Sequence, residues 1–333
     1  MEYKQLGAEG PRVSPICLGT MMFGDRTDEA TAGRIVGRAR EAGINFIDTA
    51  DAYAGGVSEE ITGRLIKADR DRWILASKVG NQMGSDPRCA GLGRQWLQRA
   101  VDDSLRRLGT DYLDIYYLHK PDPKTPLEET IAVIGEILAS GKARHFGLSN
   151  YRAWQHADAV RLCEQAGIAR PLVSQPYYNA MNRMPEVEIL PACAHYGMGV
   201  VPYSPLARGV LTGKYAPGDK PSAETRAGRQ DERMMETEFR AESIVLAKHI
   251  KERAESRGMT AGQFALNWVL ANRLVTSVLA GPRTEDQWAE YLGALDHRLD
   301  GEDEAFIDSM VAPGHPSTHG YSDPKYPITG RPA

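Results

Sequence analysis

Four titratable side chains in the first part of the chain could carry out acid–base chemistry together: Asp48, Tyr53, Lys78 and His119. A tyrosine is a weak acid with an unperturbed pKa of about 10. A neighbouring ammonium stabilises the phenolate and can lower that pKa by roughly 1–3 units, and a carboxylate keeps the ammonium charged and in place. A histidine beside the tyrosine can donate a hydrogen bond to a substrate oxygen. This combination suits the reduction of a carbonyl group, in which an alkoxide forms and must be protonated.

Each of these residues also has a structural alternative. Asp48 could cap the turn that follows it, and Lys78 could be a solvated charge. Tyr53 could pack within a loop, and His119 could be hydrogen-bonded at a buried strand end. However, three of the four stand at the ends of predicted strands and Tyr53 follows five residues after one of them, so unrelated roles would have to coincide.

The elements that must position these side chains form a regular series. Short runs rich in β-branched and apolar residues recur, most of them starting about 30 residues after the previous one, which is the length of a βα unit. Helical patterns separate the runs, which implies parallel strands covered on both faces. Eight such units favour a single (β/α)8 barrel (a TIM barrel), one domain over residues 1–333, rather than an open doubly wound sheet. The predicted strands are Ile16–Gly19, Asn45–Asp48, Trp73–Ser77, Leu113–Leu118, His145–Leu148, Leu172–Gln175, Gly199–Tyr203 and Thr276–Ala280.

The helices carry signals of their own. Leucine, isoleucine and valine make apolar stripes at helical spacing within residues 97–108 and 127–138. Three segments, Thr125–Glu128, Thr260–Gln263 and Thr284–Gln287, have the form of a capping box at a helix start.

Three segments fall outside the repeat. Residues 1–14 are predicted to form a hairpin that plugs one end of the barrel. Residues 212–260 form an insertion between the seventh strand and the helix after it, with a helix around Ala241–Arg257. Residues 313–333, rich in Pro, Gly, Ser and His, are predicted to be an irregular tail.

Several familiar catalytic motifs are missing from the chain. The sequence has no G-x-S-x-G, H-E-x-x-H or P-loop motif, and no G-x-G-x-x-G of a Rossmann domain. A nicotinamide cofactor would therefore have to bind at the rim of the barrel. The turn Gly281–Thr284 could supply a phosphate site, because helix N–H groups and the Arg283 guanidinium both favour anions; alternatively, it is a plain turn with an exposed arginine. No acidic residue precedes Thr284 in that turn, which predicts a preference for NADPH over NADH.

Composition excludes other classes of partner. The chain has 40 Lys and Arg against 44 Asp and Glu, a formal net charge of −4, so charge gives no reason to expect nucleic acid or an anionic membrane as a partner. It has no apolar run of about 18 residues, and its N-terminus lacks the apolar region of a signal peptide. We therefore expect a cytoplasmic protein that acts on a small molecule. The four cysteines are far apart in sequence, and no metal site is expected.

At the positions discussed above, the chain resembles the aldo-keto reductase family. The resemblance runs from about Leu18 to Leu295. It rests on Gly43–Ala50 with Tyr53 and Gly56–Glu59, on Ser104–His119, on Gly147–Asn150, on Gln175–Asn179, on Tyr203–Leu206 and on Gly281–Gln287.

The resemblance implies a role for each group of residues. Tyr53 would be the general acid, with Asp48, Lys78 and His119 completing a tetrad. The cofactor contacts would be Ser149, Asn150 and Gln175 at the carboxamide, Tyr203 stacked on the nicotinamide ring, Ser204, Leu206 and Gly209 at the pyrophosphate, and Gly281, Arg283, Gln287 and Glu290 at the adenosine end. Two positions depart from the family pattern: Ala54 stands where members commonly have Gly, and Tyr291 where they commonly have Asn.

The function implied is NADPH-dependent reduction of an aldehyde or ketone to an alcohol, by reversible hydride transfer. An alternative is a nicotinamide-binding regulatory or sensor subunit with slow turnover, as in barrels that resemble this one among potassium-channel β subunits. A barrel glycosidase is a weaker interpretation, because no second rim carboxylate accompanies Asp48. Loop residues including Phe23, Asn81 and Met83 would line a partly apolar substrate pocket, whose composition leaves aldehydes, ketones and sugars open. The oligomeric state is open as well.

Overall fold

The structure is built on eight parallel β-strands in the order β10-β3-β4-β5-β6-β7-β8-β9. It is a computed structural model that describes residues 1–218 and 220–327. Backbone hydrogen bonds from Thr276 N–H to the Val200 carbonyl (2.9 Å) and from Leu279 N–H to the Pro202 carbonyl (2.9 Å) connect the two ends of this order. The predicted (β/α)8 architecture is therefore confirmed. The strands are β3 (Ile16–Gly19), β4 (Phe46–Asp48), β5 (Ile74–Val79), β6 (Leu113–Leu118), β7 (Ala143–Ser149), β8 (Val173–Gln175), β9 (Gly199–Val200) and β10 (Val278–Ala280).

Each predicted strand is present, and the largest difference lies at β9. The sequence predicted a strand as far as Tyr203, whereas β9 ends at Val200. Pro202 has no N–H to donate to a neighbouring strand, and the Tyr203 N–H donates to the Pro176 carbonyl (3.0 Å). The chain therefore leaves the regular ladder here and begins the loop that carries the predicted cofactor residues.

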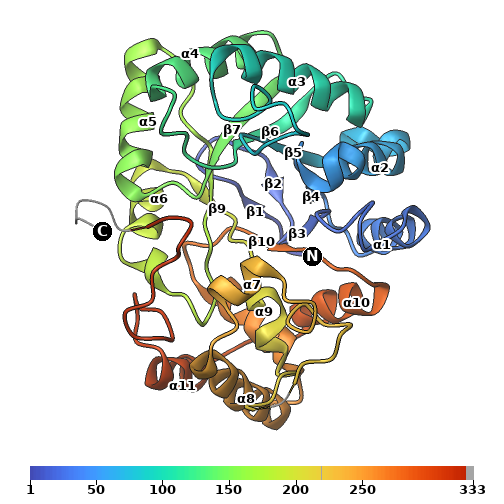
Figure 1. Cartoon of the computed structure of the whole chain (residues 1–333), viewed down its shortest axis with the longest axis vertical. Helices are drawn as coiled ribbons and strands as arrows, with labels where there is room; N and C mark the ends of the chain where they lie inside the picture. Colours follow the sequence, from blue (N-terminus) through green and yellow to red (C-terminus); the bar gives the residue numbers. More distant parts are fainter. Residues whose placement is uncertain (219, 328–333) are drawn as a thin grey trace. The chain divides into compact units, whose positions relative to one another are not determined.

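The helices that alternate with these strands lie outside them, as Figure 1 shows for α1 to α5. In α3, Leu97, Val101 and Leu108 are buried, as the apolar stripe predicted. Gly109 caps the C-terminus of α3, and its φ of 62° is the left-handed conformation typical of the residue after a helix. These helices are α1 (Glu29–Glu41), α2 (Val57–Ile66), α3 (Arg94–Leu108), α4 (Leu127–Ala139), α5 (Ala153–Ala166), α6 (Ile189–Tyr196) and α10 (Glu285–Gly293).

The three predicted capping boxes have different outcomes. The box at Thr260 is confirmed, because the Thr260 and Gln263 side chains each accept a hydrogen bond from the other residue's N–H at the start of α9. The box at Thr125 is wrong. Helix α4 begins at Leu127 with Pro126 in the cap position, and the Thr125 hydroxyl donates to the Asp122 carboxylate instead (2.7 Å). A charged acceptor makes the stronger hydrogen bond.

The chain divides into two compact units. The first, Met1–Pro176 with Glu188–Tyr203 and Arg273–Leu292, contains all eight strands of the large sheet. The second contains Tyr177–Val187, Ser204–Asn272 and Gly293–Ala333. The assignment of residues 1–333 to one domain stays a prediction.

The second unit contains both the predicted insertion and the predicted tail. The helix predicted around Ala241–Arg257 is confirmed as α8, which lies beside α11 (Figure 1), and Arg253 joins the two through Asp303 (2.8 Å). The tail is irregular over 313–327, as predicted, and its last six residues lie outside the described residues. The helices of this unit are α7 (Glu232–Thr237), α8 (Ala241–Ser256), α9 (Ala261–Ala271) and α11 (Gly301–Met310), preceded by the 3₁₀-helix η4 (Ala207–Thr212).

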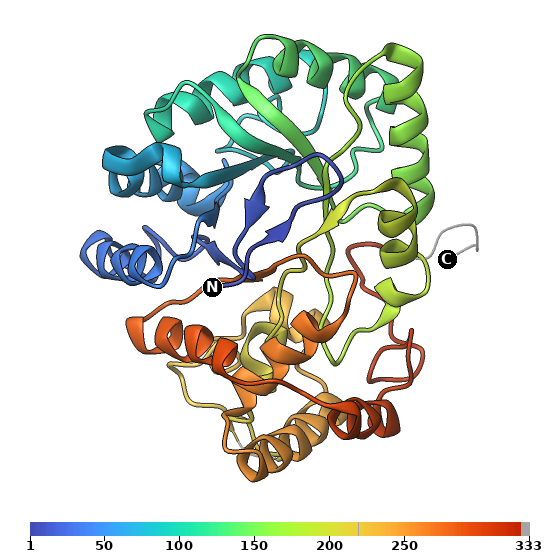
Figure 2. The ribbon, with the colours of Figure 1, turned by 180° about the vertical axis from the view of Figure 1, so that it is seen from behind.

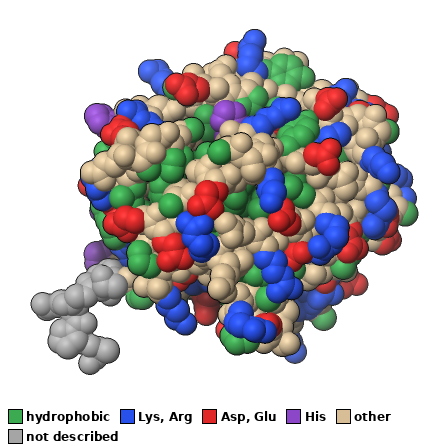
Figure 3. All heavy atoms as spheres, turned by 90° about the horizontal axis from the view of Figure 1, so that it is seen from above, with side chains coloured by type: hydrophobic (Ala, Val, Ile, Leu, Met, Phe, Trp, Pro, Cys, Tyr) green, Lys and Arg blue, Asp and Glu red, His purple; other side chains and the backbone are tan. Residues whose placement is uncertain are grey.

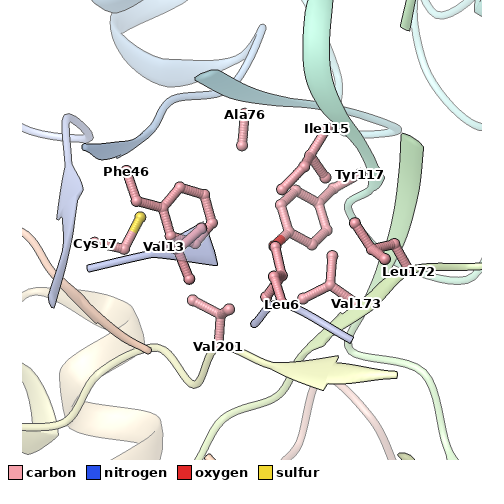
Figure 4. Packing of buried hydrophobic residues seen from close by; sticks show 10 residues of the cluster. All are labelled: Leu6, Val13, Cys17, Phe46, Ala76, Ile115, Tyr117, Leu172, Val173 and Val201. Carbon is pink, nitrogen blue, oxygen red and sulfur yellow. The ribbon is translucent and has the colours of Figure 1, made fainter. Parts of the chain in front are cut away.

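The N-terminal segment forms the predicted hairpin, in which β1 (Lys4–Gln5) pairs with β2 (Arg12–Val13). Figure 2 shows it in front of the strands when the molecule is seen from behind. The Ala8 N–H donates to the carbonyl of Gly197, just before β9 (2.8 Å), so the hairpin covers the N-terminal ends of the strands. Its apolar side chains join the buried cluster of Figure 4, which consists of Leu6, Val13, Cys17, Phe46, Ala76, Ile115, Tyr117, Leu172, Val173 and Val201.

The surface agrees with the balanced composition. On the face shown in Figure 3, acidic and basic side chains are interspersed. Among the described residues, no helix combines the length and the apolar character that a membrane crossing requires.

Candidate active site

The predicted tetrad comes together at the C-terminal ends of β4, β5 and β6. Asp48 is the last residue of β4, Lys78 lies in β5, and His119 follows β6. Tyr53 begins the 3₁₀-helix η1 (Tyr53–Gly56), and its ring meets the His119 ring edge-on with centroids 5.9 Å apart. The predicted convergence of these four side chains is therefore present in the fold.

Lys78 is the centre of this group. Its buried ammonium donates to the Asp48 carboxylate, to the Thr49 carbonyl (2.7 Å) and to the Tyr53 hydroxyl oxygen (3.2 Å). An ammonium has three N–H groups, so these partners account for all of them. Because the Tyr53 oxygen accepts from Lys78, the hydroxyl proton of Tyr53 is directed away from the ammonium, which is the arrangement a proton donor needs.

The charge state of Lys78 follows from its neighbours. Burial by itself lowers the pKa of Lys78, but the Asp48 carboxylate and Tyr53 raise it, and the net direction is upward. The ammonium is therefore charged at neutral pH.

The pKa of Tyr53 differs from the expectation. The sequence predicted a lowered value, and this is wrong: burial raises the pKa of Tyr53 by more than Lys78 lowers it. The physical cause is that desolvation penalises the phenolate. Tyr53 is consequently protonated at neutral pH, and Lys78 limits the cost of losing that proton.

The orientation of His119 is held from two sides. The Asn81 amide nitrogen lies 2.9 Å from His119 Nδ1, and the Asn150 amide donates to the His119 carbonyl (2.8 Å). An amide N–H donating to Nδ1 assigns the ring proton to Nε2. Asn81 was expected only to line the substrate pocket. Phe23, expected beside it, has no exposed surface.

The turn that carries Tyr53 has an unusual backbone. Three successive residues, Ala54, Gly55 and Gly56, have φ values of 48°, 63° and 101°. Glycine adopts this region freely, whereas a residue with a Cβ is strained there by about 1–2 kcal/mol. The departure from the family pattern at Ala54 thus falls on a position whose backbone favours glycine.

The four residues predicted to hold the nicotinamide form one chain of hydrogen bonds. Tyr203 donates to the side-chain amide oxygen of Asn150 (2.8 Å), and the Asn150 side-chain amide nitrogen donates to the Ser149 hydroxyl (3.0 Å). Ser149 donates to the Gln175 carbonyl (3.0 Å), and the Gln175 amide donates to the second oxygen of Asp48 (3.0 Å). This chain links the tetrad to the loop after β9. That these groups hold a carboxamide stays a prediction.

Hydrogen bonds fix the backbone of the predicted phosphate-binding turn, Gly281–Thr284. The Gln287 side chain accepts from the Arg283 N–H (2.8 Å), and Thr284 Oγ1 accepts from the Gln287 N–H (3.3 Å). Only half of the predicted Thr284 box is therefore formed. Glu285 pairs with Arg34 of α1 (2.5 Å). Gly281 is the first residue of this turn, and Glu290 and the buried Tyr291 lie further along α10.

Three predicted pyrophosphate residues belong to the second unit. Ser204 has a φ of 56° and Gly209 a φ of 93°, so the backbone between them is tightly turned. Leu206 is 7 % exposed. The Ser204 carbonyl accepts from the Asn179 amide (2.9 Å). Their contact with a cofactor stays a prediction.

Sequence reasoning missed two features beside the tetrad. One is the Thr49 carbonyl, a backbone acceptor that no side-chain pattern reveals. The other is Asp51, whose carboxyl is fully buried two residues before Tyr53. Its signal in the sequence was that an acidic residue other than Asp48 stands just before Tyr53.

Comparison with known proteins gives consistent results. A family model described as the aldo/keto reductase family matches residues 15–312. The chain is 35% identical over 301 residues to a probable voltage-gated potassium channel subunit beta of Oryza sativa, covering 89% of this chain and 92% of that protein. It is 34% identical to the uncharacterized oxidoreductase YrpG of Bacillus subtilis, covering 97% and 100% of the two chains. It is also 34% identical to the L-glyceraldehyde 3-phosphate reductase of Escherichia coli strain K12, covering 94% and 93%.

Proposed function

The chain belongs to the aldo/keto reductase family of oxidoreductases, and on that premise we propose that it catalyses reversible hydride transfer between NADPH and an aldehyde or ketone, with Tyr53 as general acid. The observation that carries the proposal is the set of three hydrogen bonds from Lys78 to Asp48, the Thr49 carbonyl and Tyr53. This arrangement presents a phenol proton outward and holds a fixed positive charge where phenolate charge would develop.

Each side chain of the site has its own role in the proposed reaction. The nicotinamide, when bound, supplies the hydride. His119 donates from Nε2 to the carbonyl oxygen of the substrate and orients it. Tyr53 gives its proton to that oxygen as negative charge develops, and Lys78 stabilises the phenolate left behind. Asp48 and the Thr49 carbonyl keep the ammonium in position.

The donors and acceptors present suit a nicotinamide nucleotide. The hydroxyl and amide groups of Ser149, Asn150 and Gln175 can exchange hydrogen bonds with a carboxamide, and Tyr203 offers an aromatic ring beside them. Arg283, in the turn before α10, offers a guanidinium to the ribose phosphate that distinguishes NADPH from NADH. We also propose a cytoplasmic location and a small-molecule substrate. The near-balance of charge gives no electrostatic reason to expect nucleic acid or an anionic membrane as a partner instead.

The test is Tyr53→Phe. We expect the rate of carbonyl reduction to fall about 10²- to 10⁴-fold, as for the loss of a general acid. The Kd for NADPH, measured by fluorescence quenching, should stay unchanged. Tyr112→Phe is the matched control, because Tyr112 lies just before β6, at the opposite end of that strand from His119, and stacks under Arg70 and Arg144. A Tyr53→Phe variant that keeps most of its kcat would overturn the assignment.

A second candidate is a nicotinamide-binding regulatory subunit with slow turnover. The 35% identity to the rice protein named as a channel β subunit favours it. Single-turnover and steady-state rates with bound NADPH separate the two candidates, because a sensor would turn over far more slowly than it transfers hydride. The aldehydes and ketones assayed as substrates should include aldose phosphates, since a 34% identical relative is named as an L-glyceraldehyde 3-phosphate reductase.

A further inference from the structure

Asp51 is a buried carboxyl group with no role in the chemistry described above. It has no exposed surface, and neither of its carboxyl oxygens makes a hydrogen bond of normal geometry with the described residues. Its backbone N–H donates to the Lys78 carbonyl (3.1 Å). The residue thus lies between Asp48 and Tyr53 in sequence and is tied to Lys78 in space.

The charges around Asp51 are already matched without it. Lys78 pairs with Asp48, and Arg107 of α3 pairs with Glu59 of α2 (2.7 Å), both acids being fully buried. Each buried acid therefore has one base. An ionised Asp51 would be a third buried anion with no cation of its own, which is costly in a medium of low dielectric constant.

Close packing holds the second of these pairs in place. A Cβ at Gly63 of α2 would lie 2.1 Å from the Leu108 carbonyl oxygen at the end of α3, so only glycine allows the two helices to approach this closely. The approach brings the Glu59 carboxylate to Arg107. The titratable and charged groups that influence Asp51 come from every neighbouring element: Glu59 on α2, Arg107 on α3, Lys78 on β5, Tyr53 on η1 and Tyr116 on β6.

The group titrates near neutrality. Burial, and then the Glu59 carboxylate, raise the pKa of Asp51 to about 7, against smaller opposing effects of the Ala52 N–H, Arg107 and Lys78. Asp51 is therefore mostly neutral at pH 6 and mostly charged at pH 8. Its charge acts in turn on Tyr53, whose pKa it raises.

We propose that Asp51 is a positioning residue for the reaction: its buried carboxyl sets the charge that Tyr53 and Lys78 experience, without touching the substrate. The inference rests on the proposed role of Tyr53 as general acid. When Asp51 is neutral, the positive charge of Lys78 stabilises negative charge on Asp48 and Tyr53 only. When Asp51 releases its proton to solvent, the added negative charge makes the phenolate of Tyr53 harder to form, and proton donation to the substrate slows.

The test is the pH profile of Asp51→Asn, which keeps the shape of the neutral carboxyl. With NADPH and 4-nitrobenzaldehyde, we expect the wild-type kcat for reduction to fall about 3- to 10-fold as pH rises through about 7. The variant should lack this inflection and change little between pH 6 and 8. Glu60→Gln, an exposed carboxylate on the same helix as Glu59, is the matched control and should keep the wild-type profile.

A second measurement does not depend on activity. Between pH 4 and 7 the native protein keeps a proton on Asp51 that the unfolded chain has released, so the free energy of unfolding falls as pH rises through this window. The urea midpoint of the wild type should therefore decline between pH 5 and pH 8 by more than that of Asp51→Asn. Equal declines would overturn the proposal, because Asp51 would then not titrate in this range.

Different outcomes contradict the role of Asp51 and the proposed function. An active variant that retains the inflection near pH 7 overturns the role of Asp51 alone. A wild-type protein that binds NADPH but reduces no aldehyde or ketone overturns the proposed function, and the role of Asp51 in it as well.

Discussion

A single lysine joins Asp48, the Thr49 carbonyl and Tyr53 at the base of the candidate active site. Lys78 has no exposed surface, and a buried ammonium is tolerated only when it is paired and fully hydrogen-bonded. Its three partners satisfy that requirement. One of them is the phenol oxygen of Tyr53. The same contact therefore satisfies an N–H group of the buried ammonium and places a positive charge beside the proposed acid.

Replacing Lys78 with Met should therefore reduce kcat for carbonyl reduction by at least about 10²-fold. The basic limb of the pH profile should also move upward, since Lys78 is the group that lowers the pKa of Tyr53 against burial. Steady-state rates from pH 6 to 10 measure both effects. Lys67→Met, at an exposed position after α2, is the control. An unmoved profile with surviving activity would show that Lys78 does not tune the acid.

The turn between β4 and α2 aims Tyr53 at the other three residues of the tetrad. Its left-handed residues 54–56 reverse the chain within one turn of 3₁₀-helix, so that Tyr53 lies beside Lys78 while α2 returns along the outside of the strands. The strain at Ala54 is local to this element.

Ala54→Gly should relieve that strain and raise the free energy of unfolding by about 0.5–1 kcal/mol, the gain from removing a Cβ at positive φ less the entropy that glycine adds to the unfolded chain. Urea unfolding measures it. Ala52→Gly is the matched control, because Ala52 has a φ of −82° and should lose about 0.4–1 kcal/mol instead. A loss of stability at both positions would mean that the turn is not strained.

The turn before α10 is the element on which cofactor choice is proposed to depend. Its backbone is held by Gln287 on one side and by the Thr27 hydroxyl, which donates to the Arg283 carbonyl (2.9 Å), on the other. A rigid turn presents a guanidinium with little loss of entropy on binding.

Arg283→Ala should weaken NADPH binding about ten- to a hundred-fold, the worth of one charge-assisted hydrogen-bonded contact, and leave NADH binding almost unchanged. Dissociation constants for both nucleotides, measured by fluorescence, decide this. Arg26→Ala removes an exposed arginine beside Thr27 as a control. Equal losses for NADPH and NADH would place the phosphate contact elsewhere.

At the scale of the whole molecule, the N-terminal hairpin and the candidate active site lie at opposite ends of the strands. The hairpin places Leu6 in the buried cluster with Leu172 and Val201. The N-terminal ends of the strands are thus closed by apolar packing, whereas the polar groups gather at the C-terminal ends. This division between a stabilising end and a chemical end is usual for barrels of this kind.

Leu6→Ala should lower the free energy of unfolding by about 2–5 kcal/mol, because it removes a fully buried side chain and leaves a cavity. The rate of carbonyl reduction at low temperature should be retained, since the change lies at the far end of the strands. Thermal or urea unfolding measures the loss. Leu274→Ala, at a side chain 40% exposed, is the control and should cost much less. A small effect at Leu6 would indicate that the hairpin is not part of the core.

The sequence by itself determined the architecture and the meeting of the tetrad. Eight apolar runs about one βα unit apart imply parallel strands, and the C-terminal ends of parallel strands in a closed barrel share one rim. Residues at three of those ends were therefore bound to converge, whatever the details of packing. Local signals such as the Thr260 capping box were equally readable, because every group involved lies within four residues.

Only the tertiary structure decided which partners these groups have and what charge they carry. Burial reversed the expected direction of the Tyr53 pKa, and Asp122 drew the Thr125 hydroxyl away from its helix. Gln175 reaches Asp48 across 127 positions of sequence, and the buried Asp51 carboxyl has no hydrogen-bond partner of normal geometry among the described residues. The physical reason is common to all four. Desolvation and hydrogen bonding depend on atoms that distant segments bring within a few ångströms. The spacing of residues along the chain does not predict which atoms those are.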